Sequence, residues 1–226
     1  MKKKIAILGS TGSIGKSTLE IIRKDKKNFN IILLSANNNY KKLVAQAKQF
    51  KVKNVLIKNH KFYLKVKNSL KRTKTKVYSG DISIKRIISK KLDYTMSAVV
   101  GLAGLQPTID AIKVSKTVAI ANKETIICGW QVLSKFIKKY KTEIVPVDSE
   151  HFSIMELTKG MSNEEVEEII ITASGGPFLN IPINRLKKVK AKQAIKHPNW
   201  KMGKKISIDS ATLINKVFEV IEAKKI

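Results

Sequence analysis

The sequence has few of the residues that mark secreted and membrane proteins. Its 226 residues include a single cysteine, Cys128. No internal disulfide can form, so a reducing, cytoplasmic setting is expected. No stretch reaches the length of about 18 apolar residues that a membrane-spanning helix needs. The segment Met1–Ile5 carries three lysines and leads directly into an apolar run. We therefore expect no secretion signal and no membrane partner.

Acidic residues are also scarce. The chain has 17 Asp and Glu but 45 Lys and Arg, so its net charge is +28. Such a charge can indicate nucleic-acid binding. However, only four of the basic residues are arginine, and aromatic residues make up 6% of the chain. Base readout favours arginine, and single-strand binding favours interleaved aromatic side chains. We therefore interpret the lysines as a solvated surface and expect no nucleic-acid partner.

Short apolar runs alternate with amphipathic segments along most of the chain. Such runs predict buried strands, and apolar residues recurring about every 3.6 positions predict helices. The alternation predicts an α/β fold with a Rossmann-like, doubly wound parallel sheet. The predicted strands are 4–8, 30–34, 54–57, 94–100, 117–121 and 143–147, and the predicted helices are 14–24, 40–50, 105–114 and 125–140.

This rhythm changes after residue 147. We expect a dinucleotide-binding domain at 1–147 and an α+β domain at 148–226, with strands at 166–173 and 205–208 and a long helix at 210–226. The last helix has no glycine, asparagine or proline to stop it. The second domain is therefore expected to be incomplete, and the chain to be truncated at its C-terminal end.

A glycine-rich turn, Gly9-Ser-Thr-Gly12-Ser-Ile-Gly15, separates the first predicted strand from the first predicted helix. Glycines let the backbone approach a pyrophosphate, whose charge the amides at the helix N-terminus stabilise. The G-x-x-G-x-x-G spacing alone is a weak signal, and an ordinary glycine-rich turn is the alternative. The strand–turn–helix context favours dinucleotide binding.

The second predicted strand indicates which dinucleotide binds. NAD enzymes usually place an acidic residue about 20 positions after the glycine motif. Here the sequence is Ser35-Ala-Asn-Asn-Asn39, followed by Tyr40, Lys41 and Lys42. No carboxylate is present to repel a 2′-phosphate, and the two lysines would attract it. This favours NADPH over NADH.

Acidic residues follow the predicted strand 143–147 in the segment Pro146-Val-Asp148-Ser-Glu150-His151. If this segment stays extended, Asp148 and Glu150 point the same way. Two converging carboxylates favour a cation between them, and oxygen ligands favour Mg²⁺ or Mn²⁺. Alternatively, Asp148 or Ser149 caps a helix that begins near His151. The residues alone leave both interpretations open.

Two later segments could complete a site. The segment 197–203, His-Pro-Asn-Trp-Lys-Met-Gly, is typical of a closing loop, but a surface turn anchored by a buried tryptophan fits it equally well. Further along, Ser210, Asn215 and Lys216 offer donors suited to a phosphate, and Glu219 could be a third metal ligand. The alternative for this helix is an ordinary solvated face.

Several long motifs occur in one order: 9–15, Ala-Asn-Lys-Glu at 121–124, 146–151, Ser-Gly-Gly-Pro-Phe at 174–178, 197–203 and Asp-Ser-Ala-Thr at 209–212. In these motifs the chain resembles the 1-deoxy-D-xylulose-5-phosphate reductoisomerase family over its full length. The resemblance implies an NADPH- and divalent-metal-dependent enzyme that converts 1-deoxy-D-xylulose 5-phosphate, a small phosphorylated sugar, to 2-C-methyl-D-erythritol 4-phosphate in the non-mevalonate isoprenoid pathway. It also implies a homodimer.

The resemblance implies roles for individual residues as well. The implied cofactor-binding residues are Thr11, Gly12, Ser13, Ile14, Asn37, Asn38, Asn39, Asn122, Glu124 and Gly203. The implied metal ligands are Asp148, Glu150 and Glu219, and these three with Lys123 are the implied catalytic residues. The implied substrate-binding residues are Lys123, Ser149, Glu150, Ser174, His197, Trp200, Ser210, Asn215, Lys216 and Glu219.

Two other functions share the glycine turn. Another NADP-dependent dehydrogenase is one, but aspartate-semialdehyde dehydrogenases need a nucleophilic cysteine at a helix N-terminus. Cys128 lies within an apolar helical pattern and is predicted to be buried. A non-catalytic NADP-binding protein is the other, and it would not need the carboxylates of Asp148, Glu150 and Glu219.

Overall fold

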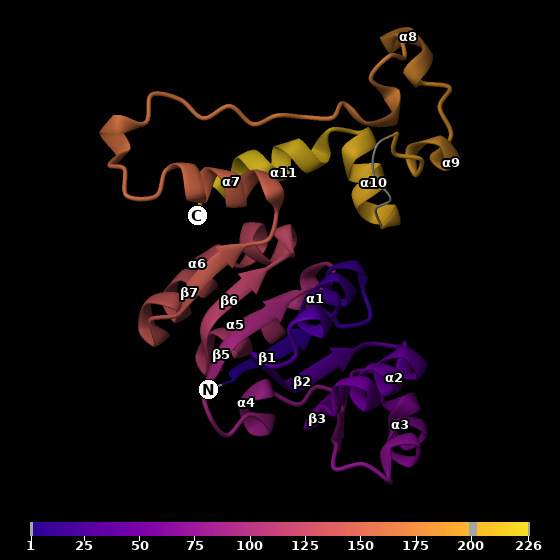
Figure 1. Ribbon diagram of the computed structural model, residues 1–226. Helices are drawn as coiled ribbons and strands as arrows, with labels where there is room; N and C mark the ends of the chain where they lie inside the picture. The colour runs from indigo at the N-terminus through magenta and orange to yellow at the C-terminus, as the bar shows by residue number, and fades with distance from the viewer. Residues whose placement is uncertain (1, 199–202, 226) are drawn as a thin grey trace. The chain divides into compact units, whose positions relative to one another are not determined.

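The computed structural model describes residues 2–198 and 203–225. Two compact units make up the chain, Met1–Val147 and Asp148–Ile226. Figure 1 labels their elements. Among the described residues, none of the helices has both the length and the apolar character needed to cross a membrane.

The first unit is built on a seven-stranded sheet with the strand order β4-β3-β2-β1-β5-β6-β7. Every neighbouring pair of strands is parallel. The predicted Rossmann-like α/β fold is therefore confirmed. The strands are β1 (Lys3–Leu8), β2 (Phe29–Ala36), β3 (Asn54–Ile57), β4 (Lys76–Ser79), β5 (Leu92–Ser97), β6 (Ser115–Ile120) and β7 (Glu143–Pro146).

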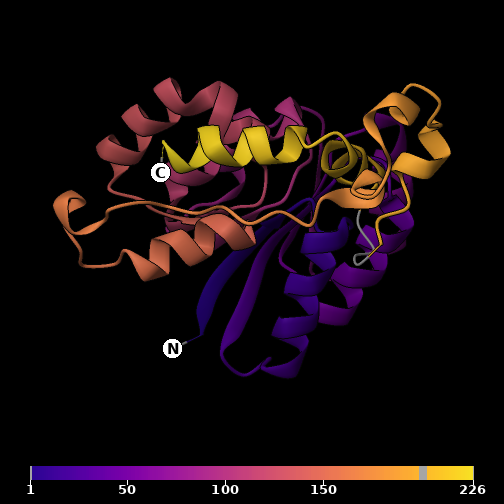
Figure 2. The same cartoon turned by 90° about the horizontal axis from the view of Figure 1, so that it is seen from above.

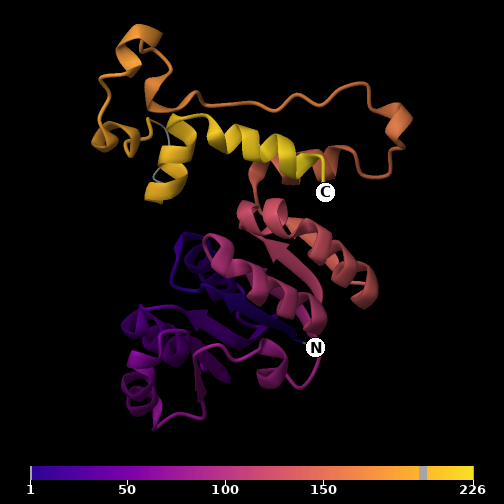
Figure 3. The ribbon, with the colours of Figure 1, turned by 180° about the vertical axis from the view of Figure 1, so that it is seen from behind.

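Helices cover both faces of this sheet, because its strands are apolar on both sides. Leu33 packs into one buried cluster and its neighbour Leu34 into the other, as alternation along a strand requires. The helices are α1 (Ser13–Lys24), α2 (Tyr40–Phe50), α3 (Tyr63–Leu70), α4 (Ile84–Ile87), α5 (Leu105–Val114) and α6 (Lys123–Tyr140), with single turns η1 (His60–Phe62) and η2 (Leu102–Gly104). Figure 3 shows α5 and α6 on the face seen from behind.

The strand order reverses between β1 and β5. From β1 the chain winds outward through β2, β3 and β4, and it then returns to β5 on the other side of β1. In doubly wound sheets such a reversal opens a crevice beyond the carboxyl ends of the two strands, and ligands bind there. The glycine turn follows β1, and the segment 98–104 follows β5, so these two segments border the crevice.

The predicted elements of this unit agree with the structure, apart from small shifts at their ends. Helices 40–50 and 105–114 and strand 54–57 match residue for residue. The sequence analysis missed α3, β4 and α4, which lie in a lysine-rich stretch with little apolar periodicity. β4 joins the sheet by pairing with β3, and the two helices pack on it through a few buried side chains, among them Val66, Leu70, Ile84 and Ile87.

The second unit is helical in the part that the structure describes. Its elements are α7 (Ser149–Leu157), η3 (Asn163–Glu165), η4 (Gly176–Phe178), α8 (Ile183–Leu186), α9 (Ala191–Ala194), α10 (Lys204–Ala211) and α11 (Ile214–Ala223). The segment 166–173 is extended and runs beside α7 and α11, as Figures 1 and 2 show.

Three predictions for the second unit are wrong. No strand occurs among its described residues, so the extended segment 166–173 has no backbone partner with which to form a sheet. The predicted strand 205–208 lies in α10, where Lys205 and Asp209 pair at 2.6 Å across one helical turn. The predicted helix 210–226 is broken, because Leu213 adopts a left-handed φ of 58° between α10 and α11.

Gly15 shows why the glycine turn tolerates no larger residue at that position. A Cβ on Gly15 would lie 2.5 Å from the Gly9 carbonyl oxygen and 2.6 Å from the Ser10 Cα. We expect Gly15→Ala to lower the free energy of unfolding by about 1–3 kcal/mol, because backbone would have to shift. Thermal and urea unfolding would measure this. Gly203→Ala, at φ −63° in open space, is the control and should leave stability unchanged. Equal stability for the two variants would contradict the packing argument.

Candidate functional site

The turn after β1 presents backbone amides rather than side chains. Gly12 is the N-cap residue of α1, and no side chain caps the amides of the first turn. Gly12, Ser13 and Ile14 are exposed, and Thr11 is half-buried. Uncapped amides at a helix N-terminus stabilise negative charge. This turn can therefore hold a phosphate group.

A buried polar network fixes the turn to the neighbouring helix. The Ser10 hydroxyl donates to Gln46 Oε1 at 2.8 Å, and Gln46 Nε2 donates back to the Ser10 carbonyl at 2.9 Å. Both residues are buried. The network thus places the middle of α2 beside the glycine turn. Sequence analysis missed Ser10 and Gln46, although a glutamine on the apolar side of an amphipathic helix is a usable signal.

The segment after β2 carries donors and no carboxylate. Asn39 caps α2 by accepting from the Lys42 amide at 3.2 Å, and Asn38 Oδ1 accepts from Asn59 Nδ2 at 2.8 Å. Asn37, Asn38 and Asn39 are all exposed. The Lys16 side chain approaches Lys42 from α1 and lowers the pKa of Lys42. Two positive charges from different helices therefore meet at this place, and Lys16 is the one that sequence analysis missed.

The start of α6 holds three of the predicted site residues. Asn122 is its N-cap residue and is 4% exposed, Lys123 is buried, and Glu124 is half-buried in the first turn. Asn122 Nδ2 donates to the carbonyls of Val99 and Gly101 at 2.5 and 2.6 Å. Its side chain therefore holds the segment after β5.

The side chain of Cys128 lies on a different face of α6 from the one that the sequence predicted. It was predicted to be buried, but its side chain is exposed. The helical periodicity therefore placed it on the wrong face of α6. It also lies in the second turn of α6, away from the N-terminal amides that would activate a thiolate. The position does not suit the nucleophile of an aspartate-semialdehyde dehydrogenase.

Three carboxylates converge in the second unit. Asp148, Glu150 and Glu219 each bring an oxygen within 4.8 Å of the others. The backbone conformation differs from the predicted one, because α7 begins at Ser149 and the segment after Asp148 is therefore helical instead of extended. Asp148 is the N-cap residue of α7, but its side chain makes no capping hydrogen bond. Glu219 comes from α11 and is 1% exposed.

The Lys216 ammonium lies between two of these carboxylates. Its Nζ is 3.0 Å from Glu150 Oε1 and also pairs with Glu219 and donates to the Thr172 carbonyl. Desolvation lowers the pKa of Lys216, but hydrogen bonds to Glu219 and Glu150 outweigh it and raise the pKa above its usual value. A positive charge at this place is therefore stabilised by the carboxylates around it.

A buried histidine, His151, contacts Asp148 and the backbone of Glu219. His151 is 3% exposed, and its Nδ1 lies 2.9 Å from Asp148 Oδ1 and 3.4 Å from Glu222 Oε2. Its Nε2 lies 2.9 Å from the Glu219 carbonyl oxygen. The ring thus joins α7 to α11 and orients Asp148. Sequence analysis assigned no role to His151 or Glu222, because only tertiary packing brings them together.

A cavity of about 650 Å³ lies beside the carboxylates. This volume suits a small-molecule site. In it the Ser174 hydroxyl lies 3.0 Å from His197 Nε2. The cavity brings together eight of the predicted substrate-binding residues, which are Ser149, Glu150, Ser174, His197, Ser210, Asn215, Lys216 and Glu219. Lys123 belongs to the first unit, Gly203 caps α10 without lining the cavity, and Trp200 lies outside the described residues.

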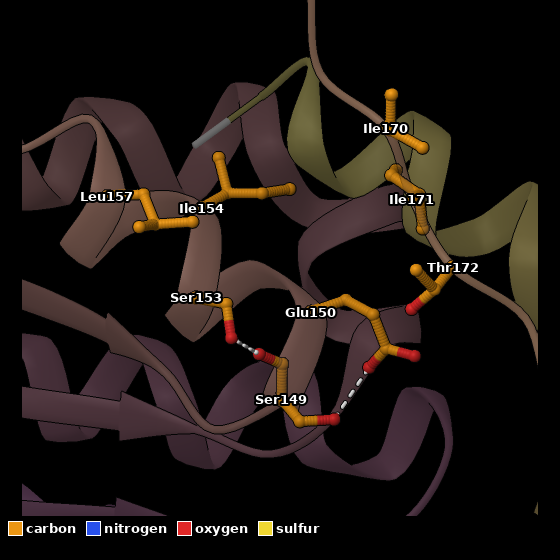
Figure 4. A pocket seen from close by; sticks show the side chains of 8 residues that line it. All are labelled: Ser149, Glu150, Ser153, Ile154, Leu157, Ile170, Ile171 and Thr172. Atoms are coloured by element: carbon orange, nitrogen blue, oxygen red, sulfur yellow. Dashed lines mark hydrogen bonds between the residues drawn. The ribbon is translucent and has the colours of Figure 1, made fainter.

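A smaller hollow of about 310 Å³ adjoins α7 (Figure 4). Its polar end carries Ser149, whose hydroxyl donates to Glu150 Oε2 at 2.7 Å. Its other walls are mostly apolar and come from Ile154 and Leu157 of α7 and from the extended segment 170–172. Ser149 and Glu150 line both hollows, so the apolar hollow adjoins the carboxylate site.

Comparison with known proteins identifies the family. The sequence model of 1-deoxy-D-xylulose 5-phosphate reductoisomerase matches residues 5–129, and that of its C-terminal domain matches residues 144–226. The chain belongs to the 1-deoxy-D-xylulose 5-phosphate reductoisomerase family. The family resemblance inferred from the motifs is thereby confirmed.

Named relatives share this sequence over nearly the whole chain. The reductoisomerase of Pelagibacter ubique is 56% identical over 99% of the chain and 58% of the relative, and that of Bacteroides fragilis is 45% identical over the same shares. The Zymomonas mobilis enzyme in complex with NADPH is 36% identical, with a TM-score of 0.89 over 99% of this chain and 57% of that one. A complex with NADPH, fosmidomycin and magnesium is 34% identical, with a TM-score of 0.85 over 98% and 57%. The chain thus spans somewhat more than half the length of these relatives.

The position of Lys216 leads to a prediction about metal affinity. We expect Lys216→Met to tighten Mn²⁺ binding by about tenfold, because a competing positive charge leaves Glu150 and Glu219. Calorimetric titration with MnCl₂ would measure it. Lys159→Met, which removes a lysine paired with Glu156 on the surface, is the matched control and should bind as the wild type does. Unchanged or weaker binding by Lys216→Met would contradict the idea that the Lys216 ammonium competes with the metal ion for Glu150 and Glu219.

Proposed function

We propose that this chain carries the NADPH-, metal- and substrate-binding residues of an enzyme that converts 1-deoxy-D-xylulose 5-phosphate to 2-C-methyl-D-erythritol 4-phosphate. The observation that carries the proposal is the convergence of Asp148, Glu150 and Glu219 beside a cavity of substrate size, in a chain of this family. The complete protein is proposed to act in the cytoplasm as a homodimer in the non-mevalonate isoprenoid pathway. This extension rests on the family alone.

The proposed cofactor is NADPH, which supplies the hydride. The uncapped amides of 12–14 and the Thr11 hydroxyl suit its pyrophosphate. Asn37, Asn38 and Asn39 follow β2, where the ribose phosphate of a dinucleotide lies. The adjoining Lys16 and Lys42 supply the positive charge that a 2′-phosphate requires. Solved relatives carry NADPH. Asn122, Glu124 and Gly203 are proposed to lie toward the nicotinamide end.

The proposed metal is Mg²⁺ or Mn²⁺, which would polarise the substrate carbonyl. Asp148, Glu150 and Glu219 would hold it, since their oxygens already gather within reach of one another. An all-oxygen ligand set suits these hard cations. The Lys216 ammonium lies between Glu150 and Glu219, which supports a cation site at these carboxylates. A solved relative carries magnesium.

The substrate phosphate is proposed to bind to donors that line the cavity. Ser174, Ser210, Asn215, Lys216 and His197 line it and together offer hydroxyl, amide, ammonium and imidazole donors. With the phosphate bound in this cavity, the sugar would lie beside the three carboxylates. Lys123 and Ser149 are proposed to contact that reacting end, and Trp200 to close over the substrate.

The proposed reaction has two stages. The carbon skeleton first rearranges to an aldehyde, and hydride transfer then reduces the aldehyde to an alcohol. The protein's contribution is to fix the substrate by its phosphate, to orient the carboxylates and to exclude water. His151 serves the second task, since it bonds to Asp148 and to the backbone of Glu219 at once.

The proposal requires Glu150 for turnover but not for cofactor binding. We expect Glu150→Gln to lower kcat at least about 100-fold in an assay of NADPH oxidation with 1-deoxy-D-xylulose 5-phosphate and Mn²⁺, because a metal ligand is lost. NADPH affinity should stay unchanged. Glu156→Gln, an exposed residue of the same helix, is the control. Full activity in Glu150→Gln would favour a non-catalytic NADP-binding protein instead.

The proposal also predicts how the nucleotide is distinguished. Lys16→Ala/Lys42→Ala should raise the KM for NADPH about ten- to a hundredfold, because bonds to the charged 2′-phosphate are lost. The KM for NADH should hardly change. Lys27→Ala, on the loop before the amino end of β2 and so away from the carboxyl ends of the strands, should leave both values as they are. Parallel changes for NADPH and NADH would contradict the assignment of the two lysines.

The decisive test of the function uses the product of the complete gene. It should oxidise NADPH when 1-deoxy-D-xylulose 5-phosphate and Mg²⁺ or Mn²⁺ are present, and a chelator should abolish the reaction. Oxidation that persists in the chelator, or that does not depend on this substrate, would contradict the proposal.

A further inference from the structure

Asn122 is a buried asparagine whose side-chain amide is committed to backbone groups. Its Oδ1 accepts from the Thr125 amide at 3.0 Å and so caps α6. Its Nδ2 donates to the carbonyls of Val99 and Gly101. A side-chain amide has two N–H groups, and these two bonds use both of them. Asn122 thereby connects the start of α6 to the segment 98–104.

The segment 98–104 borders the crevice of the first unit. The Ala98 amide donates to the Leu8 carbonyl at 2.9 Å, which continues the pairing of β5 with β1. Gly9 follows β1, and a Cβ there would overlap the Ala98 carbonyl. The glycine turn and the segment 98–104 therefore lie in direct contact where the strand order reverses. A dinucleotide bound beyond the carboxyl ends of the strands would meet both.

Few side chains hold this segment in a core. Val99 packs against the core cluster, but Val100 is 74% exposed and Leu102 is 61% exposed, so the part of the segment around Gly101 has no apolar anchor of its own. Gly101 has a φ of 73°, which other residues rarely adopt. Gly104 leaves the room that the amide needs, because a Cβ there would lie 2.5 Å from Asn122 Nδ2 and 2.7 Å from the Val99 carbonyl.

We propose that Asn122 is a positioning residue for the dinucleotide. It holds the segment 98–104 in place against the glycine turn and so shapes the crevice, and its own side chain does not contact the cofactor. The inference rests on the proposed function, because it takes NADPH as the occupant. It gives Asn122 a different role from the cofactor contact that the family resemblance implied.

The test uses two substitutions that disturb the same contact from opposite sides. Asn122→Ser keeps a good helix cap but is too short to reach Val99 and Gly101. Gly104→Ala adds the Cβ that would push against Asn122 and Val99. Each should weaken NADPH binding about tenfold in a fluorescence titration. Because both act on one contact, the double variant should lose less than the product of the two effects.

The matched control is Asn54→Ser. Asn54 is also buried and donates Nδ2 to the Ile32 carbonyl at 3.0 Å, but it lies at the amino end of β3, whereas the crevice lies beyond the carboxyl ends of the strands. It should lower the melting temperature and leave the Kd for NADPH within about twofold of wild type. A general loss of stability is thereby separated from a loss of positioning.

The outcomes separate the inference from the function on which it rests. Wild-type protein that does not bind NADPH would contradict the proposed function. Wild-type binding, with Asn122→Ser and Gly104→Ala both within about twofold of it, would contradict the positioning role alone. A loss confined to Asn122→Ser would indicate a direct cofactor contact and would also overturn it. If Asn122→Ser does not fold, weaker binding in Gly104→Ala supports the role and unchanged binding contradicts it.

Discussion

The repulsion among three carboxylates is the constraint that organises the second unit. Asp148, Glu150 and Glu219 lie within 4.8 Å of one another, and Glu219 is almost fully buried. Like charges this close destabilise a fold unless positive charge or hydrogen bonds offset them. Lys216 offsets the repulsion by pairing with Glu150, and His151 does so through its contact with Asp148. Both also bridge elements distant in sequence, so the site and the packing of α7 against α11 are one arrangement.

In the first unit, backbone groups and not charged side chains form the proposed binding site for the pyrophosphate of the dinucleotide. Amides at the start of α1 are left uncapped, and Ser10 and Gln46 fix the turn rigidly beside α2. Asn122 holds the facing segment in the same manner, through carbonyl oxygens. Backbone groups held in this way keep their geometry without a bound ligand, which lowers the cost of ordering when a ligand binds.

The sequence predicted the first unit well because strongly apolar runs mark its strands. Leu33 and Leu34 face opposite cores, and such two-sided burial leaves an unambiguous pattern. In the second unit, the alternating polar and apolar residues of 205–208 predicted a strand, yet this segment lies in α10 and no partner strand is present among the described residues. The carboxylates were found from their chemistry and motifs, although the predicted extended geometry was wrong. His151, Glu222, Lys16 and Gln46 were missed, because their roles arise from contacts that sequence spacing does not reveal.

The central claim is that Asp148, Glu150 and Glu219 together hold one divalent cation. Calorimetric titration of the metal-free protein with MnCl₂ tests it most directly, with Glu219→Gln as the comparison. We expect one Mn²⁺ to bind per chain, and the affinity for Mn²⁺ to fall at least about tenfold in Glu219→Gln. Equal binding by the two proteins, or no binding by the wild type, would contradict it.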